Sequence, residues 1–103
     1  MARFERMLAL DHRAAEGHFP GNPIIPGAVL LSEALKAIET GFATALLPCQ
    51  IKAAKFFYPV RPGDHLLIEC SGEVAGEMRF ACTVGGKTVL TAYIKCDAVL
   101  TPT

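Results

Sequence analysis

The segment from Ala28 to about Leu46 constrains the fold of this chain most, because its sequence predicts one long helix. Apolar side chains cover most of the circumference of that helix: Val29, Leu30, Leu31, Ala34, Leu35, Ile38, Phe42 and Leu46. The polar positions form a narrow stripe, which consists of Ser32, Lys36 and Glu39 and is bordered by Glu33 and Thr40. A helix with so little polar surface is expected in the middle of a fold. Gly41 weakens its last turns, and Pro48 stops it.

The remaining segments predict antiparallel strands. A short extended piece over residues 3–10 precedes the helix, and a first strand over 51–60 follows it, ended by Pro59 and the turn at residues 61–64. Three further strands each present one apolar face: Leu66, Ile68, Cys70 and Val74; then Met78, Phe80, Cys82 and Val84; then Thr88, Leu90, Ala92, Ile94, Cys96 and Ala98. The Gly85-Gly86 pair predicts a two-residue hairpin between the last two strands.

Strands with one apolar face need an apolar cover, and the helix is the only candidate. The expected fold class is therefore α+β, with a curved antiparallel sheet wrapped around one long central helix. This arrangement is the hotdog fold. No repeat, linker or low-complexity stretch interrupts the sequence, so a single hotdog domain over residues 1–103 is expected.

Composition indicates the kind of partner. Ten basic and ten acidic residues balance without a long run of either sign, which argues against nucleic acid and against a membrane surface as partners. Hydrophobic residues make up 51% of the chain, a share that does not count its nine glycines. In so small a domain this favours an apolar surface covered by a second copy, in a homodimer or a higher homo-oligomer. A monomer with a well-filled core is the alternative.

The four cysteines predict thiols that serve as small core residues. Cys49, Cys70, Cys82 and Cys96 lack the spacing of a CxxC motif, and three of them fall in the apolar phase of a predicted strand. The start of the chain is broken by Glu5 and Arg6 and does not read as a signal peptide. No apolar run is long enough for a membrane-spanning helix. A cytoplasmic location is expected.

A stiff loop precedes the helix. Within Gly17–Gly27 the sequence reads His18-Phe19-Pro20-Gly21-Asn22-Pro23 and then Ile25-Pro26-Gly27, so three prolines restrict the backbone. This segment resembles the active-site loop of the beta-hydroxyacyl-acyl-carrier-protein dehydratases, hotdog-fold enzymes of fatty acid biosynthesis in which a histidine opens an HFPGxPxxPG segment. The run Ala54-Lys55-Phe56 and the segment 59–64 are similar to the strand and turn of that family. The resemblance covers roughly residues 17–70.

The resemblance implies dehydration of a 3-hydroxyacyl thioester to the trans-2-enoyl form. That reaction needs a base at C2, a proton donor to the C3 hydroxyl, and a hydrogen-bond donor to the thioester oxygen. His18 suits the role of base, because the pKa of a histidine lies near the working pH and its loop is stiff. Gly27 opens the helix, where amide N–H groups lack intrahelical partners and can bind the thioester oxygen.

The second polar group is ambiguous. In the resembled family an acid lies five residues after the glycine of the Pro-Gly pair, and this position is Ser32 here. Glu33 follows at once, and Glu33-Ala34-Leu35 resembles the run around the family's acid. Glu33 can be the acid through a shifted helix start, or Ser32 can hold a water or the substrate hydroxyl. Loss of the acid, which would leave a weak enzyme or a binding protein, is the third reading.

Phe19, Pro26, Ala28, Phe56 and Phe57 are the expected substrate-binding residues. The acyl group is expected on acyl carrier protein or on coenzyme A, and the reaction requires no cofactor and no metal ion. Two other functions stay open. A hotdog acyl-CoA thioesterase would use a carboxylate to activate water, and a non-catalytic acyl-thioester-binding subunit would explain a serine at the position of the acid.

Overall fold

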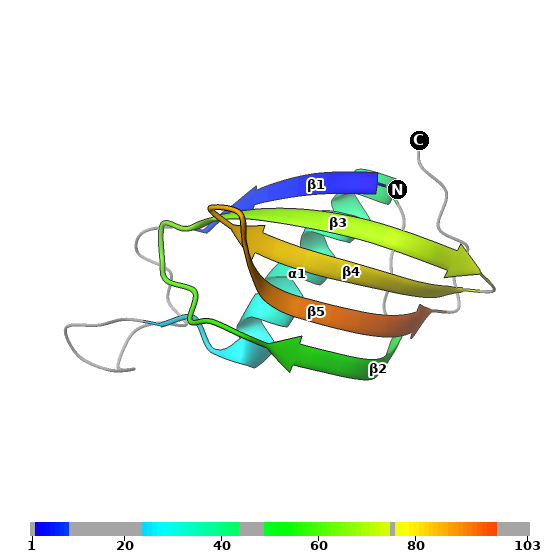
Figure 1. Cartoon of the computed structure of the whole chain (residues 1–103). Helices are drawn as coiled ribbons and strands as arrows, with labels where there is room; N and C mark the ends of the chain where they lie inside the picture. The colour runs from blue at the N-terminus through cyan, green and yellow to red at the C-terminus, as the bar shows by residue number, and fades with distance from the viewer. Residues whose placement is uncertain (1, 9–23, 44–48, 75, 97–103) are drawn as a thin grey trace.

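The computed structural model describes residues 2–8, 24–43, 49–74 and 76–96, except for the side chains of 72–74. Its elements in chain order are β1 (Ala2–Met7), α1 (Gly27–Phe42), β2 (Cys49–Phe56), β3 (His65–Val74), β4 (Glu77–Val84) and β5 (Lys87–Cys96). The strands form one antiparallel sheet in the order β1-β3-β4-β5-β2 (Figure 1). The α+β hotdog arrangement predicted from the sequence is confirmed.

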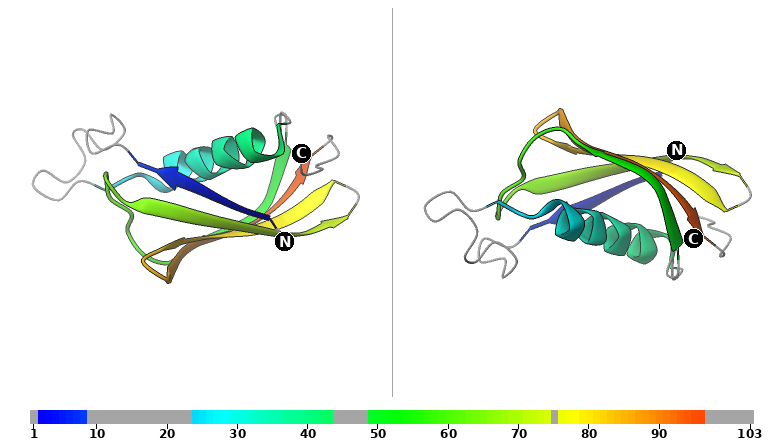
Figure 2. Two further views of the ribbon diagram at one scale, coloured as in Figure 1. Left: turned by 90° about the horizontal axis from the view of Figure 1, so that it is seen from above. Right: turned by 90° about the horizontal axis from the view of Figure 1, so that it is seen from below.

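The helix α1 lies against one face of the sheet, and the sheet curves around it (Figure 2). The buried side chains of α1 meet those of β3, β4 and β5 in one apolar core. Leu66, Ile68, Met78, Leu90 and Ile94 are almost completely buried, as their alternation with polar residues predicts. The opposite face of these strands carries the polar side chains.

Both predicted turns are present. Gly85 and Gly86 have φ values of 57° and 81°, the left-handed conformation that a tight two-residue hairpin requires and that glycine adopts without strain. In the other turn Gly63 has a φ of 92°, and the Asp64 N–H donates to the Arg61 carbonyl at 3.1 Å. The Asp64 carboxylate also accepts a hydrogen bond from the Arg61 N–H at 2.9 Å. Local turn chemistry explains both features.

The helix is shorter than predicted. It ends at Phe42 rather than near Leu46, because Ala43 takes the left-handed conformation with a φ of 55°. In that conformation the Ala43 N–H turns back to the Thr40 carbonyl at 3.3 Å, which terminates the helix. The predicted last turn falls within residues 44–48, which lie outside the described part of the chain.

Two strand predictions also differ from the structure. The strand predicted over 51–60 is β2, which starts at Cys49 and ends at Phe56. Directly after its end, the Phe57 N–H donates a hydrogen bond to the Val89 carbonyl of β5 at 2.9 Å. The alternation of residues predicts Thr88 on the apolar face of β5, but Thr88 is exposed and Val89 is buried instead. A register shift between β4 and β5 inserts Val89 as an extra residue there. Ala98 and the side chain of Val74 lie outside the described residues.

Candidate active site

One corner of the sheet anchors the chain on both sides of the predicted active-site loop. After β1, the Leu8 N–H donates to the Asp64 carbonyl at 3.0 Å, and the Leu8 carbonyl accepts from the Gly63 N–H at 2.9 Å. Before α1, the Ile25 N–H donates to the Val60 carbonyl at 2.7 Å. Leu8, Ile25 and Val60 are all buried. The chain therefore leaves β1 and enters α1 beside the same turn.

His18 and Phe19 belong to the segment between these two anchors. Residues 9–23 lie outside the described part of the chain. The role of His18 as the base and the role of Phe19 as a substrate contact both stay predictions.

The start of α1 offers two backbone donors. Pro26 is the N-cap residue, and its carbonyl accepts from the N–H groups of Val29 at 3.0 Å and Leu30 at 2.9 Å. Among the side chains that the structure describes, none caps this end. Within the described residues the N–H groups of Gly27 and Ala28 have no acceptor, as is general for the first residues of a helix. Together with the positive end of the helix dipole, these two donors form a site that favours a negatively polarised oxygen.

A cavity of about 430 Å³ lies beside this helix start. Its lining residues are Ile24, Ile25, Gly27, Leu30, Phe56, Phe57, Tyr58, Pro59 and Val60. The structure thus brings Phe56 and Phe57 together with Gly27 around one cavity, and their predicted role as substrate contacts stays a prediction. Pro26 and Ala28 adjoin the cavity along the chain, but neither lines it. Ile24, Leu30 and Val60 were not predicted, because only the fold brings these separated apolar residues together.

The ring of Phe56 packs directly on Gly27. A Cβ atom at position 27 would lie 3.2 Å from two atoms of that ring, which is tighter than most such contacts. Glycine at this position therefore lets β2 approach the helix start closely. The Phe56 side chain is still 49% exposed, and that of Phe57 is 50% exposed. One wall of the cavity is therefore open to solvent in the single chain.

Glu33 points to the other side of the helix. Its carboxylate Oε2 accepts a hydrogen bond from Nε of Arg6 on β1, and the pair forms a salt bridge. Side-chain exposure is 11% for Glu33 and 33% for Arg6. Ser32 is exposed on the solvent side of α1. The salt bridge holds the carboxylate toward Arg6 on β1, and Glu33 is not among the residues that line the cavity.

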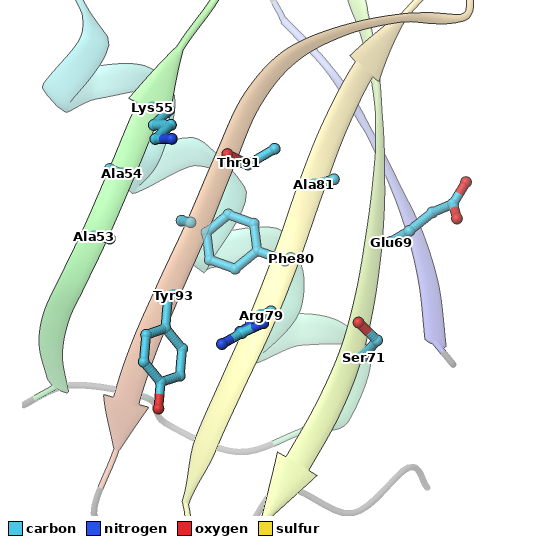
Figure 3. A pocket seen from close by; sticks show the side chains of 11 residues that line it. Ala53, Ala54, Lys55, Glu69, Ser71, Arg79, Phe80, Ala81, Thr91 and Tyr93 are labelled. Atoms are coloured by element: carbon cyan, nitrogen blue, oxygen red, sulfur yellow. The ribbon is translucent and has the colours of Figure 1, made fainter.

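A second cavity, of about 570 Å³, lies on the face of the sheet away from α1 (Figure 3). Lys55 and Arg79 both line it. The Arg79 guanidinium carbon lies 4.9 Å from the centroid of the Tyr93 ring, and the Tyr93 hydroxyl donates to Glu77 at 2.5 Å. That hydrogen bond raises the pKa of Tyr93. These two basic residues therefore lie on the opposite face from the helix start.

The sequence over residues 1–93 matches the family of ApeI-like dehydratases. The chain belongs to the ApeI-like dehydratase family. It is 40% identical to the 3-hydroxyacyl-[acyl-carrier-protein] dehydratase FabZ of Ligilactobacillus salivarius, over 87% of this chain and 72% of that protein. It is 43% identical to the FabZ of Chloroflexus aggregans, over 93% of this chain and 70% of that protein.

Structural comparison shows the same fold in a solved structure. The ApeI-like chain superposes on the dehydratase heterocomplex ApeI:P from Xenorhabdus doucetiae with a TM-score of 0.71 and 24% identity, covering 91% of this chain and 85% of that one. The family resemblance seen in the loop and turn motifs is confirmed. This chain is therefore a dehydratase. Its similarity to the FabZ proteins supports a thioester as the molecule that is dehydrated. In the described residues of the ApeI-like chain, no helix has the length and apolar character to span a bilayer.

Proposed function

We propose that this chain removes water from a 3-hydroxyacyl thioester on acyl carrier protein or coenzyme A and forms the trans-2-enoyl thioester. The observation that carries the proposal is the pair of backbone donors at the start of α1, on Gly27 and Ala28, beside the apolar cavity. A donor pair of this kind stabilises the enolate oxygen that develops when a proton leaves C2. Relatives named as 3-hydroxyacyl-[acyl-carrier-protein] dehydratases support this substrate class and a place in fatty acid biosynthesis.

In the proposed reaction His18 takes the proton from C2. The electron pair of the broken C2–H bond is first delocalised onto the thioester oxygen, which the Gly27 and Ala28 amides hold. That pair then forms the C2–C3 double bond as the bond from C3 to its hydroxyl oxygen breaks, and the oxygen leaves as water with a proton returned from the His18 imidazolium. The acyl chain lies against Phe56 and Phe57, and no cofactor or metal ion takes part.

Ser32 is the second polar group in this proposal. Its hydroxyl is exposed on α1 at the position expected for the family's acid, and it would orient the C3 hydroxyl. Glu33 is the alternative, but its carboxylate is held by Arg6 on β1. An ion-paired carboxylate accepts hydrogen bonds and has no proton to donate. We therefore assign Glu33 to the contact between α1 and β1.

The test measures enoyl absorbance with 3-hydroxyacyl thioesters, for the wild type and for His18→Ala, Ser32→Ala and Glu33→Gln. We expect His18→Ala to lower kcat on the order of 100-fold or more, as for loss of a general base. Ser32→Ala should lower kcat with an unchanged Tm, and Glu33→Gln should lower Tm while most of the activity remains. Loss of turnover in Glu33→Gln at an unchanged Tm would make Glu33 the acid. Thiol release from saturated acyl-CoA would favour a thioesterase instead.

The active form in this proposal is a homodimer of single hotdog domains over residues 1–103, joined through the edge strand β2. One side of β2 has no strand beside it within the described sheet, and all of its residues after Cys49 are exposed. The same edge carries Ile51, Phe56, Phe57 and Tyr58, all large apolar residues with 44% or more of their surface exposed. Such an edge favours pairing with a second copy, which would also close the open wall of the cavity.

Light scattering tests the dimer. Ile51→Lys should yield monomers, because two lysines would be forced into the paired edge. Met7→Lys is the matched control, since Met7 is 65% exposed on β1 at the opposite edge of the sheet, and this variant should stay dimeric. A dimer that survives Ile51→Lys but not Met7→Lys would place the interface at β1. A cytoplasmic location remains part of the proposal and agrees with four cysteines present as thiols.

A further inference from the structure

Cys49 and Cys96 face each other across two strands. They are direct Cα partners in the antiparallel ladder between β2 and β5. Cys96 donates its backbone N–H to the Gly76 carbonyl at 2.8 Å, so its peptide groups are directed toward β4 and away from β2. Cys49 and Cys96 therefore form a non-hydrogen-bonded pair, in which Cα atoms lie about 4.5 Å apart and side chains come closest.

The two sulfur atoms lie on the same side of the sheet. Cys96 is buried in phase with Ile94, and Cys49 packs against the same core from the edge strand. A disulfide needs a Cα separation of about 4.4–6.8 Å, and the general spacing of non-hydrogen-bonded pairs, about 4.5 Å, lies within that range. Cys49 is partly exposed, so one of the two thiols is accessible to a small reagent.

The other two cysteines have a different arrangement. Cys82 lies opposite Ile68, and Cys70 lies opposite Phe80, so these thiols are diagonal neighbours rather than direct partners. Diagonal positions are about 7–8 Å apart, beyond the reach of a disulfide. Burial raises the pKa of each thiol to about 12, which removes the reactive thiolate at neutral pH. Cys70 and Cys82 are therefore inert internal references.

We propose that Cys49 and Cys96 form a redox site, which closes to an intrachain disulfide by exchange with a low-molecular-weight disulfide such as oxidised glutathione. The Cys49 thiolate attacks one sulfur of the reagent and releases one thiol. The Cys96 sulfur then attacks the Cys49 sulfur of the mixed disulfide and releases the second thiol. The two cysteines lose two electrons and two protons, and the reagent disulfide gains both as two thiols.

Closure of this disulfide changes how the edge strand is held. In the described sheet β2 is hydrogen-bonded only to β5, and the disulfide adds a covalent link at its first residue. Both sulfur atoms lie on the side of the sheet that faces α1, so the outer edge of β2 stays available for pairing. The partial exposure of Cys49 leaves the bond accessible to a small thiol, so the closed form can be reduced again.

The experiment incubates the folded protein with oxidised glutathione at pH 8 and then counts thiols and records the intact mass. We expect two of the four thiols to disappear, with a mass lower by two hydrogens, one Cys49–Cys96 peptide in the digest, and full reversal by dithiothreitol. Cys96→Ser should stop at a mixed disulfide on Cys49, and Cys49→Ser should retain all three of its thiols. Cys70→Ala, the matched control for loss of one strand thiol, should still close the disulfide.

Three results would overturn the proposal. The first is a folded protein that keeps all four thiols at oxidised glutathione concentrations that fully modify the unfolded chain. The second is a covalent dimer through Cys49 on a non-reducing gel. The third is a disulfide that contains Cys70 or Cys82.

Discussion

The most specific stability prediction concerns Gly76, at the turn before β4. Its φ is 82°, and its carbonyl accepts the N–H of Cys96. A Cβ atom at this position would lie 2.3 Å from the Cys96 carbonyl oxygen, a separation that real Cβ atoms essentially never show. Gly86 is a matched control, because its φ is 81° and a Cβ atom there would meet nothing within 4 Å. The two substitutions to alanine therefore differ only in the contact.

The expected magnitudes follow from this difference. An L residue at positive φ costs about 1–2 kcal/mol, and alanine recovers roughly 0.4–1 kcal/mol by restricting the unfolded chain. Gly86→Ala should therefore lower the free energy of unfolding by about 1 kcal/mol. Gly76→Ala carries the same cost plus the overlap with a backbone oxygen, and overpacking adds roughly 1–3 kcal/mol. The difference of about 2 kcal/mol corresponds to a Tm difference on the order of 10 °C in a domain of this size.

Urea denaturation followed by circular dichroism measures both variants beside the wild type. The wild-type m-value should be kept in each, so that the midpoint reports stability alone. Equal midpoints for Gly76→Ala and Gly86→Ala would refute the reasoning, because the contact with Cys96 would then have no cost.

Two further predictions concern the core. Gly41→Ala should lower Tm although alanine favours helices, because the added Cβ would lie 1.9 Å from the Phe4 ring. The double variant with Phe4→Leu should recover most of the lost Tm in the same thermal scan. Stability should also fall at alkaline pH, since burial raises the pKa of the Cys70 and Cys82 thiols from 9.0 to about 12. Their contribution is complete below pH 9 and is lost as the pH rises toward 12. The loss is on the order of 1 kcal/mol per pH unit for each thiol. A stability that stays flat between pH 9 and 11 would contradict this prediction.

The sequence alone was sufficient for the strands and turns that depend on local chemistry. Apolar and polar residues alternate in β3 and β4, and successive side chains of a strand point to opposite faces, so Ile68 and Phe80 were correctly expected in the core. The Gly85-Gly86 pair predicted its hairpin because those φ values are strained for other residues. The Pro-Gly loop also carried enough information for the dehydratase family, through motif spacing alone.

Tertiary structure decided the features that depend on contacts between distant segments. The direction of Glu33 is one case, because its salt bridge requires Arg6, which lies 27 residues away on β1. The packing of the Phe56 ring on Gly27 and the pairing of Cys49 with Cys96 are others. Val89 is buried because of a register shift against β4, which the alternation within β5 does not encode. Periodicity determines which side chains share a face of a strand or helix, but only the packed sheet determines which atoms of another segment they meet.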